Sequence, residues 1–447
     1  MWGAATAAYQ VEGAAKEDGR GLSIWDTFSH TLGKTEKGDT GDIACDMYHR
    51  YPGDVEIMKH LGLKGFRLSI SWSRLFPNGD EVRENRGFAF YDKLINALLA
   101  EGITPFITLY HWDLPQALEN KGGWRSRETV SAFGKYAAAV AEHFGDRVKH
   151  FSPINEPWCV AWLGHGLGVH APGIADRATA FKVAHHTVIA HATAVNAMRA
   201  VRGDLKIGPV LNQANYPADD PNDPIQSRAA EILDAVQNRW WMDAIFYGKY
   251  PQILLDEYGS EFMDAILPGD MELAQAKNDW LGINYYFDTR VGSSDTSKPV
   301  QFDNSALLGL SIDSTPQGEL TDMGWPITPL GLTNMLVRWK NEFGSRLPQV
   351  FITENGCAYP DSPDVRGEVT DLRRISYLEK HLNAILDSIQ QGVNIGGYFQ
   401  WSLLDNFEWS LGYQKRFGIV FVDYPTQKRT IKKSGIWYSE VIKQNGF

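Results

Sequence analysis

Short apolar runs alternate with longer segments of helical periodicity along most of this chain. Apolar residues are nearly continuous in the short runs, as in strands that are buried on both faces of a parallel sheet. We predict eight such strands, at residues 4–9, 65–70, 104–109, 148–154, 206–211, 280–285, 349–353 and 395–401.

Between these runs, apolar residues recur every three or four positions, as they do along one face of a helix. The clearest stripes lie at residues 91–99, 130–144 and 375–389, and each is followed within three residues by a glycine. Glycine commonly ends a helix, so these segments are predicted helices with defined ends. Residues 293–321 are polar with weak periodicity, and we expect a long loop there.

About eight strand–helix units in one chain close most simply into a (β/α)8 barrel of the TIM type. We therefore predict an α/β protein in which residues 1–447 form a single catalytic barrel domain, with long loops after the strands building the active-site cleft. A doubly wound open sheet is the alternative fold. We find no glycine-rich phosphate-binding fingerprint after an early strand to support it.

Polar or aromatic residues follow the predicted strands at a mean spacing of about 56 residues, one-eighth of the chain. They are Gln10, Arg67, His111, Glu156, Asn212, Tyr286, Glu354 and Trp401. The carboxyl ends of barrel strands are where active sites of this fold lie. These residues are therefore candidates for one shared site.

Composition narrows the class of partner. The formal net charge of −11 argues against a nucleic-acid-binding protein or a basic membrane-surface protein. Aromatic residues make up 12% of the chain, and its 15 tryptophans suggest a site lined with flat apolar faces. Such a site suits a small-molecule substrate; the oligomeric state is left open.

Three cysteines without a CxxC pair indicate free thiols in a reducing compartment rather than a disulfide frame or a zinc site. The first dozen residues show no signal-peptide pattern, and no apolar stretch approaches a membrane span. We therefore expect a cytoplasmic protein that does not enter a membrane.

Two glutamates stand directly after predicted strands. Glu156 lies in the sequence SPINEP, and Glu354 lies in FITENG. Either one alone could be a solvated loop carboxylate or a helix cap. Together, at the ends of two strands of one barrel, they can divide the work of glycoside hydrolysis, one as proton donor and the other as nucleophile.

The other strand ends support a sugar site. Arg67 places a cation where it would lower the pKa of a neighbouring carboxyl group, although a surface ion pair is the alternative. His111 with Trp112, Asn284 with Tyr286, and Trp401 with its flanking residues add amides, hydroxyls and indole faces. Sugars present apolar C–H faces edged by hydroxyl groups, which this mixture of side chains matches.

Seven motifs, in order, resemble glycoside hydrolase family 1 across residues 2 to about 424. They are WGAATAAYQVEG from Trp2, FRLSISWSR from Phe66, HWDLP from His111, NEP from Asn155, NYY from Asn284, TENG from Thr353 and DNFEW from Asp405. The chain is therefore identified as a member of that family. The resemblance implies a TIM barrel and a retaining β-glucosidase that needs no cofactor or metal.

The resemblance also implies residue roles. Glu156 would be the acid/base and Glu354 the nucleophile, held by Arg67 and Tyr286, with the two carboxyl groups about 5–5.5 Å apart. Trp401 would lie under the sugar ring, and the family usually has a cis peptide between Trp401 and Ser402. The remaining sugar-binding residues would be Gln10, His111, Trp112, Asn155, Asn284, Glu408, Trp409 and Phe417.

Glu408 and Glu156 also restrict the substrate. Family members that cleave 6-phosphoglycosides have serine and a basic residue where this chain has Glu408 and Trp409, so an unphosphorylated hexose is expected. Thioglucosidase members have glutamine in place of Glu156, so an O-glycoside is expected. We predict an exo-acting β-glucosidase for cello-oligosaccharides and aryl or alkyl β-glucosides, with β-galactosidase or β-fucosidase side activity.

The leaving-group side of the cleft is less determined. We expect Trp325 to line the entrance of the cleft, together with four residues just after Glu156, namely Trp158, Trp162, Leu163 and Leu167. Trp162 and Leu167 could instead pack the loops.

Two other functions are weighed, a catalytically idle sugar-binding barrel and a metal-dependent isomerase. The intact glutamate pair argues against an idle barrel. The neighbours of the pair are Asn, Arg, Tyr and Trp rather than a His/Asp/Glu ligand set, which argues against a metal-dependent isomerase.

Overall fold

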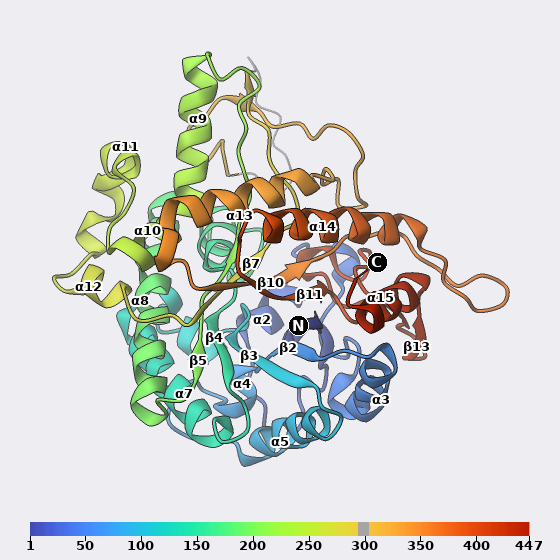
Figure 1. Ribbon diagram of the computed structural model, residues 1–447. Coiled ribbons are helices and arrows are strands. Elements are labelled where there is room, and N and C mark those ends of the chain that lie inside the picture. Colours follow the sequence, from blue (N-terminus) through green and yellow to red (C-terminus); the bar gives the residue numbers. More distant parts are fainter. Residues whose placement is uncertain (294–303, 447) are drawn as a thin grey trace.

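The computed structural model describes residues 1–293 and 304–446. Residues 294–303, part of the predicted long loop, lie outside the described residues. The centre of the molecule is a parallel sheet surrounded by helices (Figure 1). Its strands are β1 (Trp2–Ala5), β2 (Gly65–Ser69), β3 (Thr104–Tyr110), β4 (His150–Ile154), β5 (Lys206–Ile207), β6 (Val210–Asn212), β7 (Trp280–Asn284), β10 (Gln349–Asn355) and β11 (Ile395–Trp401).

The sheet closes on itself because β5 and β6 are two halves of one strand. β5 pairs with β4, β6 pairs with β7, and Asn155 beyond β4 pairs with Val210 of β6. All of these pairings are parallel, as are those of the other barrel strands, so the predicted eight-stranded (β/α)8 barrel is confirmed.

Two predicted strands differ most from the structure in their bounds. Residues 206–211 are not continuous, because Pro209 has no N–H to donate to a neighbouring strand. The first strand is Trp2–Ala5, and the last two residues of the predicted run 4–9 belong to helix α1 (Ala8–Val11) instead. The alanine-rich sequence there is apolar at nearly every position and therefore gives no period that distinguishes strand from helix.

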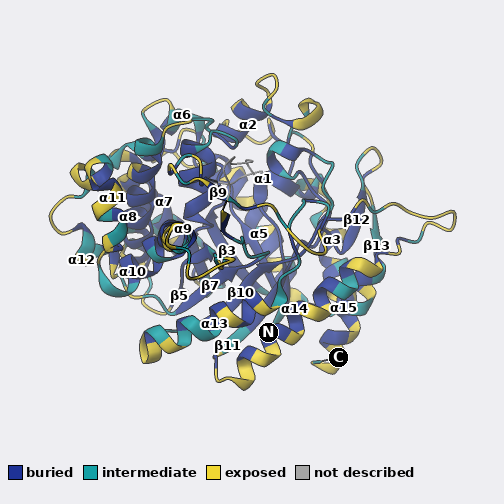
Figure 2. Cartoon of the chain, turned by 90° about the horizontal axis from the view of Figure 1, so that it is seen from above, coloured by how far each residue is buried: buried dark blue, intermediate teal, exposed yellow. Residues whose placement is uncertain are grey.

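Helices follow the strands and form the outer wall of the barrel. The longest are α3 (Met47–Leu61), α5 (Asn85–Ala100), α7 (Arg127–Phe144), α8 (Arg177–Val201), α13 (Pro329–Phe343), α14 (Leu372–Gln390) and α15 (Lys433–Gln444). The three predicted helical stripes lie in α5, α7 and α14. Seen from above, the buried residues fill the centre and the exposed residues lie on the outer faces of the helices (Figure 2).

Shorter elements build the connections. The short helices are α2 (Ile24–Ser29), α4 (Trp72–Leu75), α6 (Gln116–Glu119), α9 (Pro224–Asp234), α10 (Trp240–Tyr247), α11 (Gln252–Phe262) and α12 (Asp270–Ala274). Two small antiparallel sheets pair β8 (Gly292–Ser293) with β9 (Ile312–Asp313), and β12 (Val420–Asp423) with β13 (Lys428–Ile431). No helix of the described residues has the length and apolar character needed to cross a membrane.

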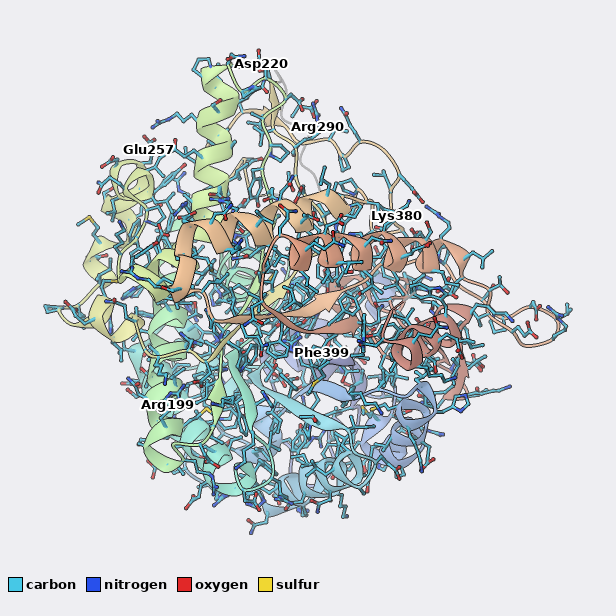
Figure 3. All side chains as sticks on the ribbon, viewed as in Figure 1. Arg199, Asp220, Glu257, Arg290, Lys380 and Phe399 are labelled. Atoms are coloured by element: carbon cyan, nitrogen blue, oxygen red, sulfur yellow. The ribbon has the colours of Figure 1, made fainter. Side chains whose placement is uncertain are left out.

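An aromatic layer fills the barrel interior. Phe106 of β3 lies 4.9 Å from Phe399 of β11 and 5.5 Å from Phe351 of β10, measured between ring centroids. Phe399 lies at the centre of the molecule in Figure 3. Gly3 of β1 makes room for it, because a Cβ atom there would lie 2.6 Å from the Phe399 ring. This packed layer leaves the opposite, carboxyl end of the barrel for polar groups.

Replacing Phe399 with alanine should lower the free energy of unfolding by about 3–5 kcal/mol, the usual range for deleting a buried aromatic side chain. Leu372→Ala is the control, because Leu372 is 65% exposed at the start of α14. Denaturant unfolding measures both changes. Equal midpoints for the two variants would show that the aromatic layer does not stabilise the barrel.

Candidate active site

A cavity opens at the carboxyl ends of the barrel strands, and most of the predicted site residues line it. Those in its wall are His111, Trp112, Glu156, Trp158, Leu163, Asn284, Tyr286, Trp325, Glu354, Trp401, Glu408, Trp409 and Phe417. They come from the ends of five strands, β3, β4, β7, β10 and β11, and from the segments that follow them. The barrel therefore brings together residues that are up to about 300 positions apart.

Glu354 is paired with a buried cation. Arg67 Nη1 donates to Glu354 Oε1 at 2.5 Å, and the two side chains are 2% and 4% exposed. Tyr286 donates its hydroxyl to the other oxygen, Oε2, at 2.7 Å. Both Glu354 oxygens therefore have a donor, and the carboxylate is fixed in one orientation.

Glu156 has a different environment. Asn284 Nδ2 donates to Glu156 Oε1 at 2.6 Å, and the thiol of Cys159 donates to Oε2 at 3.1 Å. Both donors are uncharged. The backbone of Glu156 has a φ of +46°, in the left-handed region that non-glycine residues rarely adopt. Such strain persists only where the surrounding structure holds it, and it clusters at functional sites.

Amide side chains connect the two glutamates. Arg67 Nη2 donates to Asn155 Oδ1 at 2.6 Å, and Asn284 Nδ2 lies 3.1 Å from the same oxygen. Thr353 orients Asn284 through a 2.7 Å hydrogen bond from its hydroxyl to Asn284 Oδ1. The positions of Glu156 and Glu354 are thus set by one continuous network from β2, β4, β7 and β10.

The two environments separate the proton affinities of the glutamates. Burial and the charge of Glu354 raise the pKa of Glu156 to about 8. Burial also raises the pKa of Glu354, while Arg67 and Tyr286 lower it. We expected Arg67 to lower the pKa of a neighbouring carboxyl group below its usual value; its influence has that sign, but burial outweighs it. Of these two glutamates, Glu156, which no cation contacts, is the one that holds its proton more strongly.

Glu408 is a third buried carboxyl group in the cavity. Burial and the charges of Glu354 and Glu156 raise its pKa to about 8. Gln10 Nε2 reaches Glu408 Oε2 at 3.5 Å and is held by the Phe407 carbonyl at 2.8 Å. Gln10 reaches this position from helix α1, and not from the strand end on which we expected it.

Aromatic rings form the rest of the inner wall. His111 lies nearly parallel to Trp401 and to Trp409, with ring centroids 5.9 Å apart in each pair. Trp112 and Trp409 are 4.6 Å apart. Both have a positive φ, +77° for Trp112 and +52° for Trp409, so the indole positions are held against local backbone preference. The peptide bond between Trp401 and Ser402 is cis, as the resemblance implied.

Three expected site residues do not line the cavity themselves. Gln10, Arg67 and Asn155 are fully or almost fully buried, and each contacts a residue of the cavity wall. Asn155 Nδ2 lies 3.0 Å from His111 Nε2. Sequence reasoning missed Cys159, which it treated only as a free thiol. Its position one helical turn after Glu156 was the available signal.

At the outer side, Trp158, Leu163 and Trp325 line the cavity as expected. Trp162 does not: it is 1% exposed and packs edge-on against Phe181 of α8. Leu167 packs against the hydrophobic core. Amide side chains that were not predicted complete this side, namely Gln213, Gln237 and Asn304, beside the strand-end residue Asn212.

The structure is a closed parallel barrel with an aromatic-walled cavity at its strand ends. The cavity holds a pair of buried carboxyl groups, which are the groups that glycoside hydrolases use. The chain belongs to glycosyl hydrolase family 1, whose sequence model matches residues 1–447.

Similar proteins agree with this membership. Beta-glucosidase A of Thermotoga maritima is 46% identical over 448 residues, which cover 100% of this chain and 97% of the relative. The 1,4-beta-D-glucan glucohydrolase of Thermotoga neapolitana is 45% identical, with 100% and 98% covered. The solved structure of a Thermotoga maritima beta-glucosidase in complex with deoxynojirimycin matches with a TM-score of 0.94 and 44% identity, covering 100% of this chain and 98% of that chain.

Replacing Glu354 with glutamine should lower the pKa of Glu156, because the charge of Glu354 is one of the two causes that raise it. Difference infrared titration of the carboxyl band measures this, with Glu156→Gln assigning the signal. Glu408→Gln is the control and should change the Glu156 pKa less. An unchanged or higher Glu156 pKa in Glu354→Gln would contradict the coupling.

Proposed function

We propose that this protein is an exo-acting, retaining β-glucosidase in which residues 1–447 work as one catalytic domain. The observation that carries the proposal is the contrast between the two glutamates of the cavity. Glu354 is held by Arg67 and Tyr286, whereas Glu156 has only neutral donors. One is suited to attack and the other to give up a proton.

In the first step, the Glu354 carboxylate attacks the anomeric carbon of the substrate. The bond from that carbon to the leaving-group oxygen breaks, and Glu156 donates its proton to this oxygen. The alcohol departs and the sugar remains esterified to Glu354. Arg67 and Tyr286 keep the attacking carboxylate oriented throughout.

In the second step, Glu156 acts as a base. Once Glu354 is esterified, the charge that raised the pKa of Glu156 is gone, so its carboxylate form becomes more accessible. It takes a proton from water, the water oxygen attacks the anomeric carbon, and the bond to Glu354 breaks. Two inversions give net retention, for which a carboxyl separation of about 5–5.5 Å is expected. Both steps balance with two glutamates and water, and no cofactor or metal is required.

The inner end of the cavity suits an unphosphorylated glucosyl unit. Trp401 offers a flat face, and His111, Asn155, Asn284, Gln10 and Glu408 offer hydrogen-bonding groups for its hydroxyls, with Trp112, Trp409 and Phe417 completing the wall. In its ionised form Glu408 would repel a phosphate at position 6, and in either form its carboxyl group can accept from free 4- and 6-hydroxyls. Because such contacts tolerate either epimer at position 4, β-galactosides and β-fucosides are expected as poorer substrates.

The outer end of the cavity suits both sugars and apolar leaving groups. Trp158, Leu163 and Trp325 offer apolar faces, and the neighbouring amides of Asn212, Gln237 and Asn304 can bond a second sugar. Cello-oligosaccharides and aryl or alkyl β-glucosides are therefore the proposed substrates, and the name of the Thermotoga neapolitana relative supports the first.

Three buried, unpaired cysteines support a reducing, cytoplasmic location.

The protein should hydrolyse 4-nitrophenyl β-D-glucoside and release β-glucose first, as proton NMR of the early product will show. Glu156→Ala should slow hydrolysis by about 10²–10⁴-fold, the usual contribution of a general acid. Glu354→Ala should lose more activity, because no covalent intermediate can form. The exposed Glu379→Ala on α14 is the control, with activity unchanged.

Azide separates the two roles. It should restore turnover of Glu156→Ala and give the β-glucosyl azide, and it should give the α-glucosyl azide with Glu354→Ala, because only one inversion then occurs. An α-glucose first product from the unmodified protein would exclude retention. No hydrolysis at all, with sugar still bound, would indicate a catalytically idle barrel.

A further inference from the structure

The loop that follows β11 supplies much of the sugar-facing wall. Residues 405–418 carry Glu408, Trp409, Leu411 and Phe417, all of which line the cavity. The Glu408 carboxylate is only loosely held by its neighbours, since the hydrogen bond from Gln10 is 3.5 Å long. The position of this carboxylate therefore depends on the loop backbone.

Both ends of the loop meet at one buried carboxylate. Asp405 is fully buried, and its Oδ1 accepts from the Gly418 backbone N–H at 3.0 Å. Its Oδ2 accepts from Arg416 Nη1 at 2.8 Å. The approach is so close that a Cβ atom on Gly418 would lie 2.1 Å from the Asp405 nitrogen. Asp405 thus fastens the last residues of the loop to its first.

The same carboxylate is tied to the barrel wall. Lys432, which precedes α15 and is fully buried, donates to Asp405 Oδ1 at 2.7 Å and to Asp361 Oδ2 at 2.6 Å. Asp361 also pairs with Arg374 of α14 at 2.6 Å. The loop base is therefore connected through Lys432 to the segment after β10, the strand that ends in Glu354.

We propose that Asp405 is a positioning residue for sugar recognition, which closes the 405–418 loop and thereby sets where Glu408 and Trp409 meet the sugar. The inference rests on the proposed function, since it assumes that the Glu408 carboxylate accepts hydrogen bonds from the sugar. Asp405 lines no part of the cavity, so it acts on the substrate only through the loop.

The chain offers a matched control in Asp361. The Asp361 side chain is 6% exposed and belongs to the same charge network, but its carboxylate bonds Lys432 and Arg374 rather than a residue of the 405–418 loop. Asp361→Asn and Asp405→Asn therefore each remove one carboxylate charge beside Lys432. Only the second removes the direct hydrogen bonds from Arg416 and Gly418, and the bond from Arg374 Nη2 to the Arg416 carbonyl, 2.7 Å long, is available in both variants.

The test compares 4-nitrophenyl β-D-glucoside with its 6-deoxy analogue, which lacks one hydroxyl that Glu408 can accept from. In Asp405→Asn, kcat/KM for the glucoside should fall about tenfold relative to the analogue, the size of a lost hydrogen bond to a buried carboxyl group. The ratio should stay at its original value in Asp361→Asn, even where the melting temperature falls equally. A second readout does not depend on hydrolysis. The ratio of the dissociation constants of D-glucose and 6-deoxy-D-glucose should change in the same variants.

Two further variants make the outcome decisive. Arg416→Met removes the hydrogen bond from Arg416 to Asp405 and should shift the ratio in the same direction. The inference is therefore tested even if Asp405→Asn does not fold. In a Glu408→Gln background, Asp405→Asn should change the ratio no further. Equal ratios in Asp405→Asn and Asp361→Asn would overturn the inference. Failure of glucoside hydrolysis with an intact binding ratio would overturn the proposed function alone.

Discussion

The buried ion pair between Arg67 and Glu354 is the interaction on which the rest of the site depends. A charged carboxylate this deep in a protein is stable only with a partner, and removing one partner of such a pair typically costs about 3–5 kcal/mol. The pair joins β2 to β10, strands that are not neighbours in the sheet. Only closure of the barrel places them face to face. The proposed catalytic arrangement and the fold are therefore stabilised by the same contact.

The contrast between the glutamates follows from where that single guanidinium points. Arg67 donates to Glu354 and to Asn155 but makes no hydrogen bond to Glu156. Glu156, on the far side of Asn284, has neutral donors, and its burial together with the charge of Glu354 raises its pKa to about 8. Burial also raises the pKa of Glu354, but Arg67 and Tyr286 counteract it, so two chemically identical side chains differ in how strongly they hold a proton. The proposed double displacement needs this difference and then reverses it when Glu354 is esterified.

Much of this arrangement was predictable from the sequence, because barrel strands give strong apolar signals and their ends fall at regular intervals. Glu156, Glu354, Arg67 and Trp401 were located in this way, and the family resemblance implied the roles proposed for them. The first strand was misplaced, since an alanine-rich run has no distinguishing period. Cys159 was treated only as a free thiol, although its position one helical turn after Glu156 was a signal. Asp405 was named only as the first residue of a motif, because its partners Arg416, Gly418 and Lys432 lie 11 to 27 positions further along the chain and no local pattern shows that they meet it.

The most direct test of the account is covalent labelling with a 2-deoxy-2-fluoro β-glucoside that carries a good leaving group, followed by peptide mass spectrometry. The fluorine slows hydrolysis of the glycosyl-enzyme, so the labelled residue can be identified. The account predicts a label on Glu354 alone, formed much more slowly in Arg67→Met because the carboxylate has lost its cation. A label on Glu156, or an Arg67→Met variant labelled at the original rate, would contradict it.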